Sequence, residues 1–211
     1  MERLDRERAP EILDAACRVI GRDGAHGLRM EAVAREAGVS KALVHYYFAT
    51  RRELIRAAFL HSEDRANACS EVELATLDTG AERLERLLVL DLDDEPAFSE
   101  NRALWGAAWS LMRHDDELRP EVDRQYRAWN AWIAALVEEG QADGSIPSGI
   151  DSAAVVERLS AVVDGLESQL LLGLVSPSDA ARIVRECIDL ELGRRPAAAG
   201  AVNRNRERNV V

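Results

Sequence analysis

The chain has 211 residues, 47% of them hydrophobic and 31% charged, which suits a small domain joined to a larger one and is enough to bury a core. Its net charge of −11 is distributed as +1 over residues 1–66, −16 over 67–193 and +4 over 194–211, so only the N-terminal segment is expected to approach nucleic-acid phosphates without strong repulsion. No apolar run reaches the length of a membrane span and residues 1–10 lack the apolar stretch of a secretory signal, so we expect no membrane partner and a cytoplasmic location.

Apolar residues recur at three- and four-residue spacing along most of the chain, and glycine and proline fall between the periodic segments. No alternating strand pattern of useful length is present, so we expect an all-α protein. In chain order, the expected helices cover residues 10–22, 30–37, 41–48, 50–69, 80–92, 97–114, 119–140, 151–173 and 177–193. Residues 194–211 lack an apolar face and are expected to form a disordered tail.

The second and third expected helices are joined by the sequence Ala37-Gly38-Val39-Ser40. Gly38 allows the positive φ that a tight turn needs, Val39 is an apolar plug between the helices, and Ser40 is a good N-cap for the third helix. This spacing predicts a helix-turn-helix motif, in which the second helix enters the major groove of DNA. Since two helices joined by a turn occur in other helical proteins, a protein-binding adaptor that does not bind DNA is the alternative.

The segment from Gly24 to Leu54, GAHGLRMEAVAREAGVSKALVHYYFATRREL, closely resembles the DNA-binding segment of the TetR-like (tetracycline repressor) family. The matching features are a glycine, a Val-Ala pair, AGVS, an aromatic-rich helix ending in Phe48, and a Thr-Arg step before Glu-Leu. The resemblance implies an N-terminal three-helix helix-turn-helix domain and a larger C-terminal helical domain that binds a ligand and dimerises. We therefore expect domains at residues 1–50 and 51–193, followed by the tail at 194–211.

By this resemblance, the residues expected to face base edges and phosphates are Ser40, Lys41, Ala42, Leu43, His45, Tyr46, Tyr47 and Arg51. Lys41 is the only lysine of the chain, and a lysine in the first turn of a recognition helix can reach guanine or a phosphate. Arg51 stands at a helix start, where the dipole disfavours a cation, so a phosphate partner would explain it.

The segment also departs from the family pattern. Arg29 replaces the usual Ser or Thr cap of the second helix and adds a charge that could bind phosphate. Val44-His45 replaces the frequent Leu-Tyr pair, which exchanges a tyrosine contact for a pH-sensitive histidine contact. The alternative is that His45 is an ordinary surface residue, and that Tyr47 and Phe48 belong partly to the core.

The last two expected helices carry continuous apolar stripes, which favour a homodimer interface formed by two helices from each subunit. The predicted interface residues are Val155, Leu159, Val162, Leu166, Leu170, Ile183 and Cys187. The two-fold symmetry of such a dimer would match a palindromic double-stranded DNA operator. The same stripes would also be explained by burial within one chain.

Aromatic residues gather on two helices of the C-terminal domain and suggest an aromatic pocket suited to a cationic small-molecule effector. The predicted pocket residues are Phe98, Trp105, Trp109, Met112, Tyr126 and Trp129; the alternative is ordinary core packing. Carboxylates that could add charge to it are Glu100, Asp123 and Asp164, whereas the acidic run at residues 91–95 is interpreted as a solvated loop and His114-Asp115-Asp116 as a helix end. The C-terminal domain also resembles the BetI-like branch of the family, and the segments that carry this resemblance are WGAAWSLMRHDDELRPEVDR and VVDGL. No ligand is inferred from it.

The sequence contains no glycine-rich phosphate loop, no G-x-S-x-G and no metal-ligand spacing, so we expect no enzyme, no cofactor, no catalytic residues and no metal. The widely spaced cysteines Cys17, Cys69 and Cys187 favour small core residues over a disulfide scaffold or a zinc site. The predicted function is a transcriptional repressor that an effector releases from its operator. An activator would use the same chemistry and remains an alternative.

Overall fold

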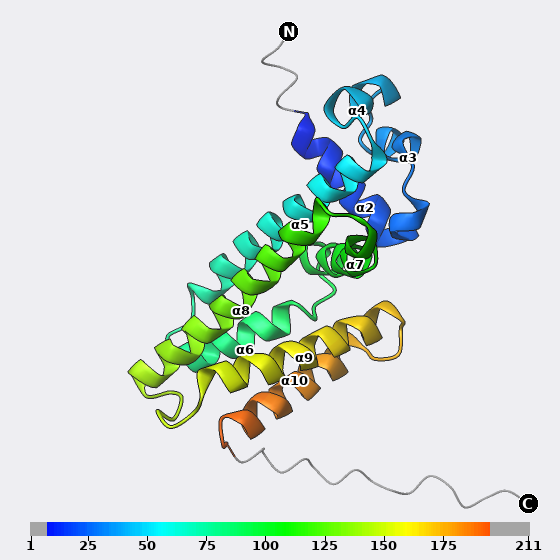
Figure 1. Cartoon of the computed structure of the whole chain (residues 1–211). Helices are drawn as coiled ribbons and strands as arrows, with labels where there is room; N and C mark the ends of the chain where they lie inside the picture. Colours follow the sequence, from blue (N-terminus) through cyan, green and yellow to red (C-terminus); the bar gives the residue numbers. More distant parts are fainter. Residues whose placement is uncertain (1–7, 195–211) are drawn as a thin grey trace, which may run out of the picture.

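The computed structural model describes residues 8–194, and within this range the fold is all-helical, without strands (Figure 1). The helices are α2 (Ala9–Gly27), α3 (Met30–Glu36), α4 (Lys41–Tyr47), α5 (Arg51–Leu74), α6 (Gly80–Leu90), α7 (Pro96–Leu111), the 3-10 turn η1 (Met112–His114), α8 (Leu118–Asp143), α9 (Ser152–Leu171) and α10 (Pro177–Glu191). The all-α prediction is confirmed, and each expected helix is present with small shifts of its ends. The predicted disordered tail lies outside the described residues except for Arg194.

Helices α2, α3 and α4 form a compact head at one end of the molecule (Figure 1). The turn between α3 and α4 begins with Gly38 at φ 66°, where the Val39 N–H donates to the Ala34 carbonyl at 2.9 Å and satisfies the end of α3. Ser40 then caps α4, its hydroxyl accepting from the Leu43 N–H at 3.1 Å. The predicted helix-turn-helix geometry therefore follows from three consecutive residues.

Helix α5 belongs to two hydrophobic cores. Its first half places Leu54 and Phe59 in a core shared with α2–α4 and α7, whereas Ala66 and Leu74 lie in a second core formed with α6, α8, α9 and α10. On α7, Leu104 joins the first core, so α7 packs against the head as well. The domain boundary expected at residue 50 stays a prediction, and the apolar packing of the head continues across it.

A close approach of two glycines fixes how α6 meets α8. A Cβ atom at Gly80 would lie 2.2 Å from the backbone nitrogen of Gly140 and 2.8 Å from the Leu136 carbonyl oxygen. The start of α6 is tied to the same place, because the Gly80 N–H donates to the Asp143 carboxylate at 2.7 Å. Glycine at residue 80 is therefore required by contact between two backbones.

We expect Gly80→Ala to lower the free energy of unfolding by about 1–3 kcal/mol, because backbone cannot move aside as a flexible side chain can. Urea denaturation followed by circular dichroism measures this change. Gly149→Ala is the matched control, since a Cβ at this loop glycine meets nothing within 4 Å. Equal stability of the two variants would contradict the packing at Gly80.

Candidate functional site

The recognition helix α4 turns one face to the core of the head and leaves the other open. Val44 is fully buried and Phe48 is 7% exposed, so the interpretation of Phe48 as a core residue is confirmed. The predicted DNA-facing residues on the open side are Ser40, Lys41, Ala42, His45 and Tyr46, with Leu43 and Tyr47 half-buried at its edge. The structure thus brings seven of the predicted contacts onto one surface, on which Tyr46 is 67% exposed.

Lys41 forms an ion pair with Glu31 of α3 on this open surface. The Lys41 ammonium holds the pKa of the Glu31 carboxyl below its usual range. Both side chains are more than half exposed, and solvent screening makes exposed pairs of this kind weak. A phosphate or a guanine edge can therefore take the place of Glu31 as the partner of Lys41.

The two predicted arginine contacts lie in different surroundings. Arg29 is exposed ahead of α3, where its side chain makes no capping hydrogen bond, as the loss of the family's Ser or Thr predicts. The Arg51 guanidinium instead donates to the Leu28 carbonyl at 2.9 Å and to the Ala25 carbonyl. Arg51 thus has protein partners in place of the predicted phosphate, and it joins the start of α5 to the end of α2.

Two ion pairs connect α5 to the segment between α7 and α8. Arg52 lies 2.7 Å from the Asp115 carboxylate and Arg56 lies 2.9 Å from Glu117. Asp115 is 8% exposed in its side chain and also accepts from the backbone N–H groups of Glu117 and Leu118. The segment interpreted from sequence as a simple helix end therefore also ties the first half of α5 to the region between α7 and α8.

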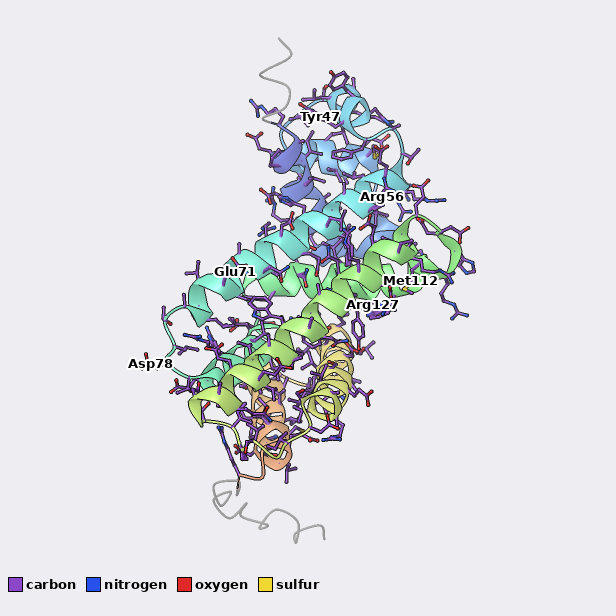
Figure 2. All side chains as sticks on the ribbon, turned by 60° about the vertical axis from the view of Figure 1, so that its left-hand side comes forward. Tyr47, Arg56, Glu71, Asp78, Met112 and Arg127 are labelled. Atoms are coloured by element: carbon purple, nitrogen blue, oxygen red, sulfur yellow. The ribbon has the colours of Figure 1, made fainter. Side chains whose placement is uncertain are left out.

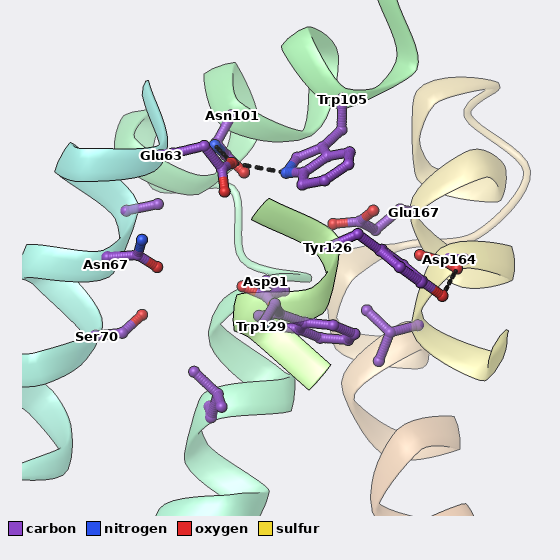
Figure 3. Close-up of a pocket in the computed structure, with 13 residues that line it drawn as sticks. Glu63, Asn67, Ser70, Asp91, Asn101, Trp105, Tyr126, Trp129, Asp164 and Glu167 are labelled. Atoms are coloured by element: carbon purple, nitrogen blue, oxygen red, sulfur yellow. Dashed lines mark hydrogen bonds between the residues drawn. The ribbon is translucent and has the colours of Figure 1, made fainter. Parts of the chain in front are cut away.

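A cavity of about 540 Å³, counting its opening to solvent, lies among α5, α6, α7, α8 and α9 (Figure 3). Three aromatic residues line it: Trp105 from α7, and Tyr126 and Trp129 from α8. The Tyr126 ring lies between the other two, with centroids 6.3 Å from Trp105 and 6.4 Å from Trp129. The other residues that line the cavity are Glu63, Ala66, Asn67, Ser70, Leu87, Asp91, Asn101, Val163, Asp164 and Glu167.

Half of the predicted pocket residues lie at this cavity. Trp109 does not line the cavity but packs against two residues that do, with its ring centroid 5.4 Å from that of Trp105 and 5.6 Å from that of Tyr126. Phe98 does not line the cavity because it fills the second core at 2% exposure. Met112 does not line it either, because it lies at the turn between α7 and α8 and packs on the first core (Figure 2).

Four carboxylates line the cavity, and sequence reasoning identified only Asp164 among them. Glu63 accepts from Asn101 Nδ2 at 2.5 Å and from the Trp105 indole N–H at 2.7 Å. Asp164 accepts from the Tyr126 hydroxyl at 3.0 Å. Asp91 was expected in a solvated loop; instead it caps the end of α6 and lines the cavity, together with Glu167 from α9.

The two other carboxylates considered for the pocket lie elsewhere. Glu100 is paired with Arg65 at 2.9 Å between α5 and α7, and Asp123 is paired with Arg127 at 2.9 Å on the surface of α8. Both carboxylates are therefore neutralised by arginines outside the cavity. The negative charge of the cavity comes from α5, the end of α6 and α9.

Burial raises the pKa values of the carboxyl groups that line the cavity, so they are weaker acids than carboxyl groups in water. Desolvation, followed by repulsion from Glu63, raises the pKa of Asp91 to about 7. Burial and repulsion from Asp91 raise the pKa of Glu167 well above its usual range. Arg102 opposes both shifts, but its guanidinium donates to the Asp91 and Asp93 carbonyls at 3.0 and 3.2 Å. None of the described residues that line the cavity is basic, so its field favours a cation.

The predicted dimer face is only partly available on α9 and α10. Val155, Leu159 and Leu166 are at most 4% exposed because they fill the second core of their own chain, so they cannot meet a partner. Val162, Leu170, Ile183 and Cys187 are half-buried against the same core. The large apolar side chains that remain exposed there are Leu171, Leu172, Leu174 and Leu190.

Within residues 8–194, no group of three His, Cys, Asp or Glu side chains is placed to hold a metal ion. No helix in this described range combines the length and the apolar character needed to cross a membrane. Cys17 is buried in the head, and Cys69 and Cys187 are half-buried. All three thiols are free.

The raised pKa of Asp91 predicts that the ligand-free protein loses stability as the pH rises. The unfolded carboxyl titrates near 3.8 and the folded one near 7, so the stabilisation from holding the proton is complete below the first value and is lost through the second. We expect thermal unfolding to shift to lower temperature between about pH 5 and about pH 8, and Asp91→Asn to flatten this dependence. Asp123→Asn, at the surface pair, should leave the slope unchanged; an unchanged slope in Asp91→Asn would contradict the assignment.

Comparisons with known proteins agree with both parts of the structure. Residues 12–58 match the model of bacterial regulatory proteins of the tetR family, and residues 80–193 match the C-terminal model of the BetI-type transcriptional repressor. The HTH-type transcriptional regulator BetI of Brucella abortus is 26% identical over 193 residues, which cover 90% of this chain and 94% of the relative.

Solved structures extend this similarity. A TetR-family transcriptional regulator from Rhodococcus sp. is 33% identical, with a TM-score of 0.75 over 89% of this chain and 99% of that chain. A transcriptional regulator from Saccharomonospora viridis, solved in complex with choline, is 28% identical, with a TM-score of 0.79 over 90% of this chain and 97% of that chain. The chain therefore belongs to the TetR family of bacterial transcriptional regulators and carries a C-terminal domain of the BetI type.

Proposed function

We propose that this regulator is a homodimeric repressor that leaves a palindromic operator when a small cationic effector fills the cavity. The observation that carries the proposal is that α5 and α7 both line the cavity and pack against the DNA-binding head. A ligand at the cavity therefore acts on the two helices that pack against α2 of the head. A protein that acts on an operator would act in the cytoplasm, where the DNA lies.

On the DNA side, the open face of α4 supplies the contacts. Lys41 lies in the first turn, where it can reach a guanine or a phosphate. His45 and Tyr46 lie one turn further on and can bind phosphates or thymine methyl groups. Arg29 adds an exposed cation beside the start of α3. The remaining proposed contacts are Ser40, Ala42, Leu43 and Tyr47.

On the effector side, the aromatic and acidic lining of the cavity favours a cation. The faces of Trp105, Tyr126 and Trp129 attract positive charge, more strongly when water is excluded. The Saccharomonospora viridis relative holds choline, a quaternary ammonium ion. We propose a small organic cation as the effector class here.

The coupling between the two sites runs through charged contacts between the same helices. Arg65 of α5 lies 2.9 Å from Glu100 of α7 and 3.4 Å from Asp14 of α2. The neighbouring residue of α7, Asn101, donates to Glu63 in the cavity. An effector that moves α5 relative to α7 would therefore also move the head; it shifts the equilibrium only if it binds the two arrangements unequally.

The homodimer would form through α9 and α10, which lie side by side at the end of the molecule away from α4 (Figure 1). Leu172 and Leu174 in the turn between these helices, and Leu190 near the other end of α10, are each about 70% exposed, which leaves apolar side chains at both ends of the helix pair for a second copy. A two-fold axis through these helices would present two copies of α4 to successive major grooves.

DNA binding tests the head, with a DNA site that the wild-type protein selects from a random-sequence library. We expect Lys41→Ala to weaken binding by about 1–3 kcal/mol, because a base or phosphate contact is lost. Glu31→Gln should strengthen binding modestly, because it releases Lys41 and removes a negative charge from the DNA-facing surface. Fluorescence anisotropy at fixed salt measures both changes.

The double variant is the control, since the part of the Glu31 effect that acts through Lys41 must disappear when Lys41 is absent. No selected DNA site for the wild-type protein would refute the repressor and favour a protein-binding adaptor. Equal DNA affinity of all four proteins would refute the contact made by Lys41.

Effector binding tests the cavity. We expect Tyr126→Leu to weaken binding of an organic cation such as choline by about tenfold, because the central aromatic face of the cavity is lost, while DNA affinity stays at the wild-type level. Trp132→Leu is the matched control on the same helix, because Trp132 packs on the second core and does not line the cavity. Calorimetry with ligand and anisotropy with DNA separate the two effects, and equal loss in both variants would contradict the cavity as the effector site.

A further inference from the structure

The cavity holds four carboxyl groups, more than one monovalent cation can pair with when they are ionised. Its four carboxylates come from three helices: Glu63 from α5, Asp91 from the end of α6, and Asp164 and Glu167 from α9. They lie close enough together to raise one another's pKa values. The buried guanidinium of Arg102 donates to the backbone carbonyls of Asp91 and Asp93 and to the Asp94 carboxylate, and Arg102 does not line the cavity.

The acceptors of the cavity are also better suited to N–H donors than to methyl groups. A quaternary ammonium ion has no N–H group, so it interacts with the aromatic faces and with the negative electrostatic potential of the cavity but donates no N–H hydrogen bond to the carboxylates. Carboxylate oxygens form their strongest contacts with charged donors at hydrogen-bond distance. Asn67 and Ser70 add amide and hydroxyl groups on the α5 wall.

Glu63 and Asp164 lie on opposite sides of the aromatic rings, whereas Asp91 lies beside Trp129 and Glu167 beside Tyr126, between those two sides (Figure 3). Glu63 lies on the α5 side, held by Asn101 and Trp105, and Asp164 lies on the α9 side, held by Tyr126. Trp105, Tyr126 and Trp129 occupy the region between these two walls. An elongated ligand that spans the cavity from Glu63 to Asp164 would therefore meet a carboxyl group at each end, and along its middle the aromatic rings together with Asp91 and Glu167.

We propose that the cavity binds a linear alkyl diamine in its doubly protonated form. One ammonium group is bound at Glu63, the other at Asp164 and Glu167, and the methylene chain lies against the aromatic rings. This inference rests on the proposed effector site and narrows its ligand class from organic cations in general to dications with N–H donors. Such a ligand neutralises two carboxylates, whereas a monocation leaves one wall uncompensated.

The test compares three probes on the full chain by isothermal titration calorimetry at fixed pH and salt. Butane-1,4-diamine carries two ammonium groups, 1-aminobutane carries one on the same carbon chain, and choline carries a single charge without N–H. We expect the diamine to bind at least about tenfold more tightly than either monocation, which corresponds to about 1.4 kcal/mol for the second charged contact. The diamine should also release the selected DNA site at the lowest concentration.

The outcomes separate the inference from the function on which it rests. Equal affinity for the diamine and 1-aminobutane, or tighter binding of choline, would overturn the diamine inference and leave the cationic effector site standing. Absence of binding by all three cations would overturn both, while DNA binding by the head would still be measured independently.

Variants locate the second charge. Asp164→Asn keeps an oxygen that accepts from the Tyr126 hydroxyl but removes the charge, so it should lower the preference for the diamine over 1-aminobutane by about tenfold. Glu63→Gln should do the same from the α5 wall. Asp123→Asn, on the surface of α8, should leave the preference unchanged. Since Asp164 is only half-buried, its variant tests the proposal even if Glu63→Gln fails to fold, and an unchanged preference in Asp164→Asn would overturn the proposed pose.

Discussion

Helix α5 packs into both hydrophobic cores, and the arrangement of the rest of the molecule depends on this shared packing. Phe59 fills the core of the head, while Leu74, about four turns later, fills the core of the larger half. Well-packed interiors transmit displacement because they contain little free space. Neither half can therefore move against α5 without disturbing a core, and Glu63, between these two positions, places the cavity on the same helix.

The cavity shows how burial changes the role of an ordinary side chain. In water a carboxyl such as Asp91 is ionised at neutral pH, and burial next to other carboxylates favours its protonated form. The protein can fold around these groups because protons reduce their repulsion, and a cation can later replace the protons. The repulsion among the buried carboxylates is thus reduced by protons in the ligand-free fold and by the cation in the complex.

The head was largely predictable from sequence because its signals are local. Gly38 and Ser40 act on their immediate neighbours, and their spacing alone specifies the turn between α3 and α4. The cavity was not, because Glu63, Asp91 and Glu167 are brought together only by tertiary packing. Periodicity likewise identified an apolar stripe on α9, but it could not tell that Leu159 is covered by its own chain. Sequence likewise could not reveal the partners of Arg51, because the carbonyls that it binds belong to the end of another helix.

The ion pair between Lys41 and Glu31 has a consequence for how ionic strength governs DNA binding. Each lysine that neutralises a phosphate normally releases counterions from DNA, which makes affinity fall steeply with salt. When Lys41 turns from Glu31 to a phosphate, the Glu31 carboxylate is left to attract a cation from solution. The net release of ions is then smaller than the number of phosphate contacts suggests, so the affinity of this head for DNA varies less with salt than its contacts alone would imply.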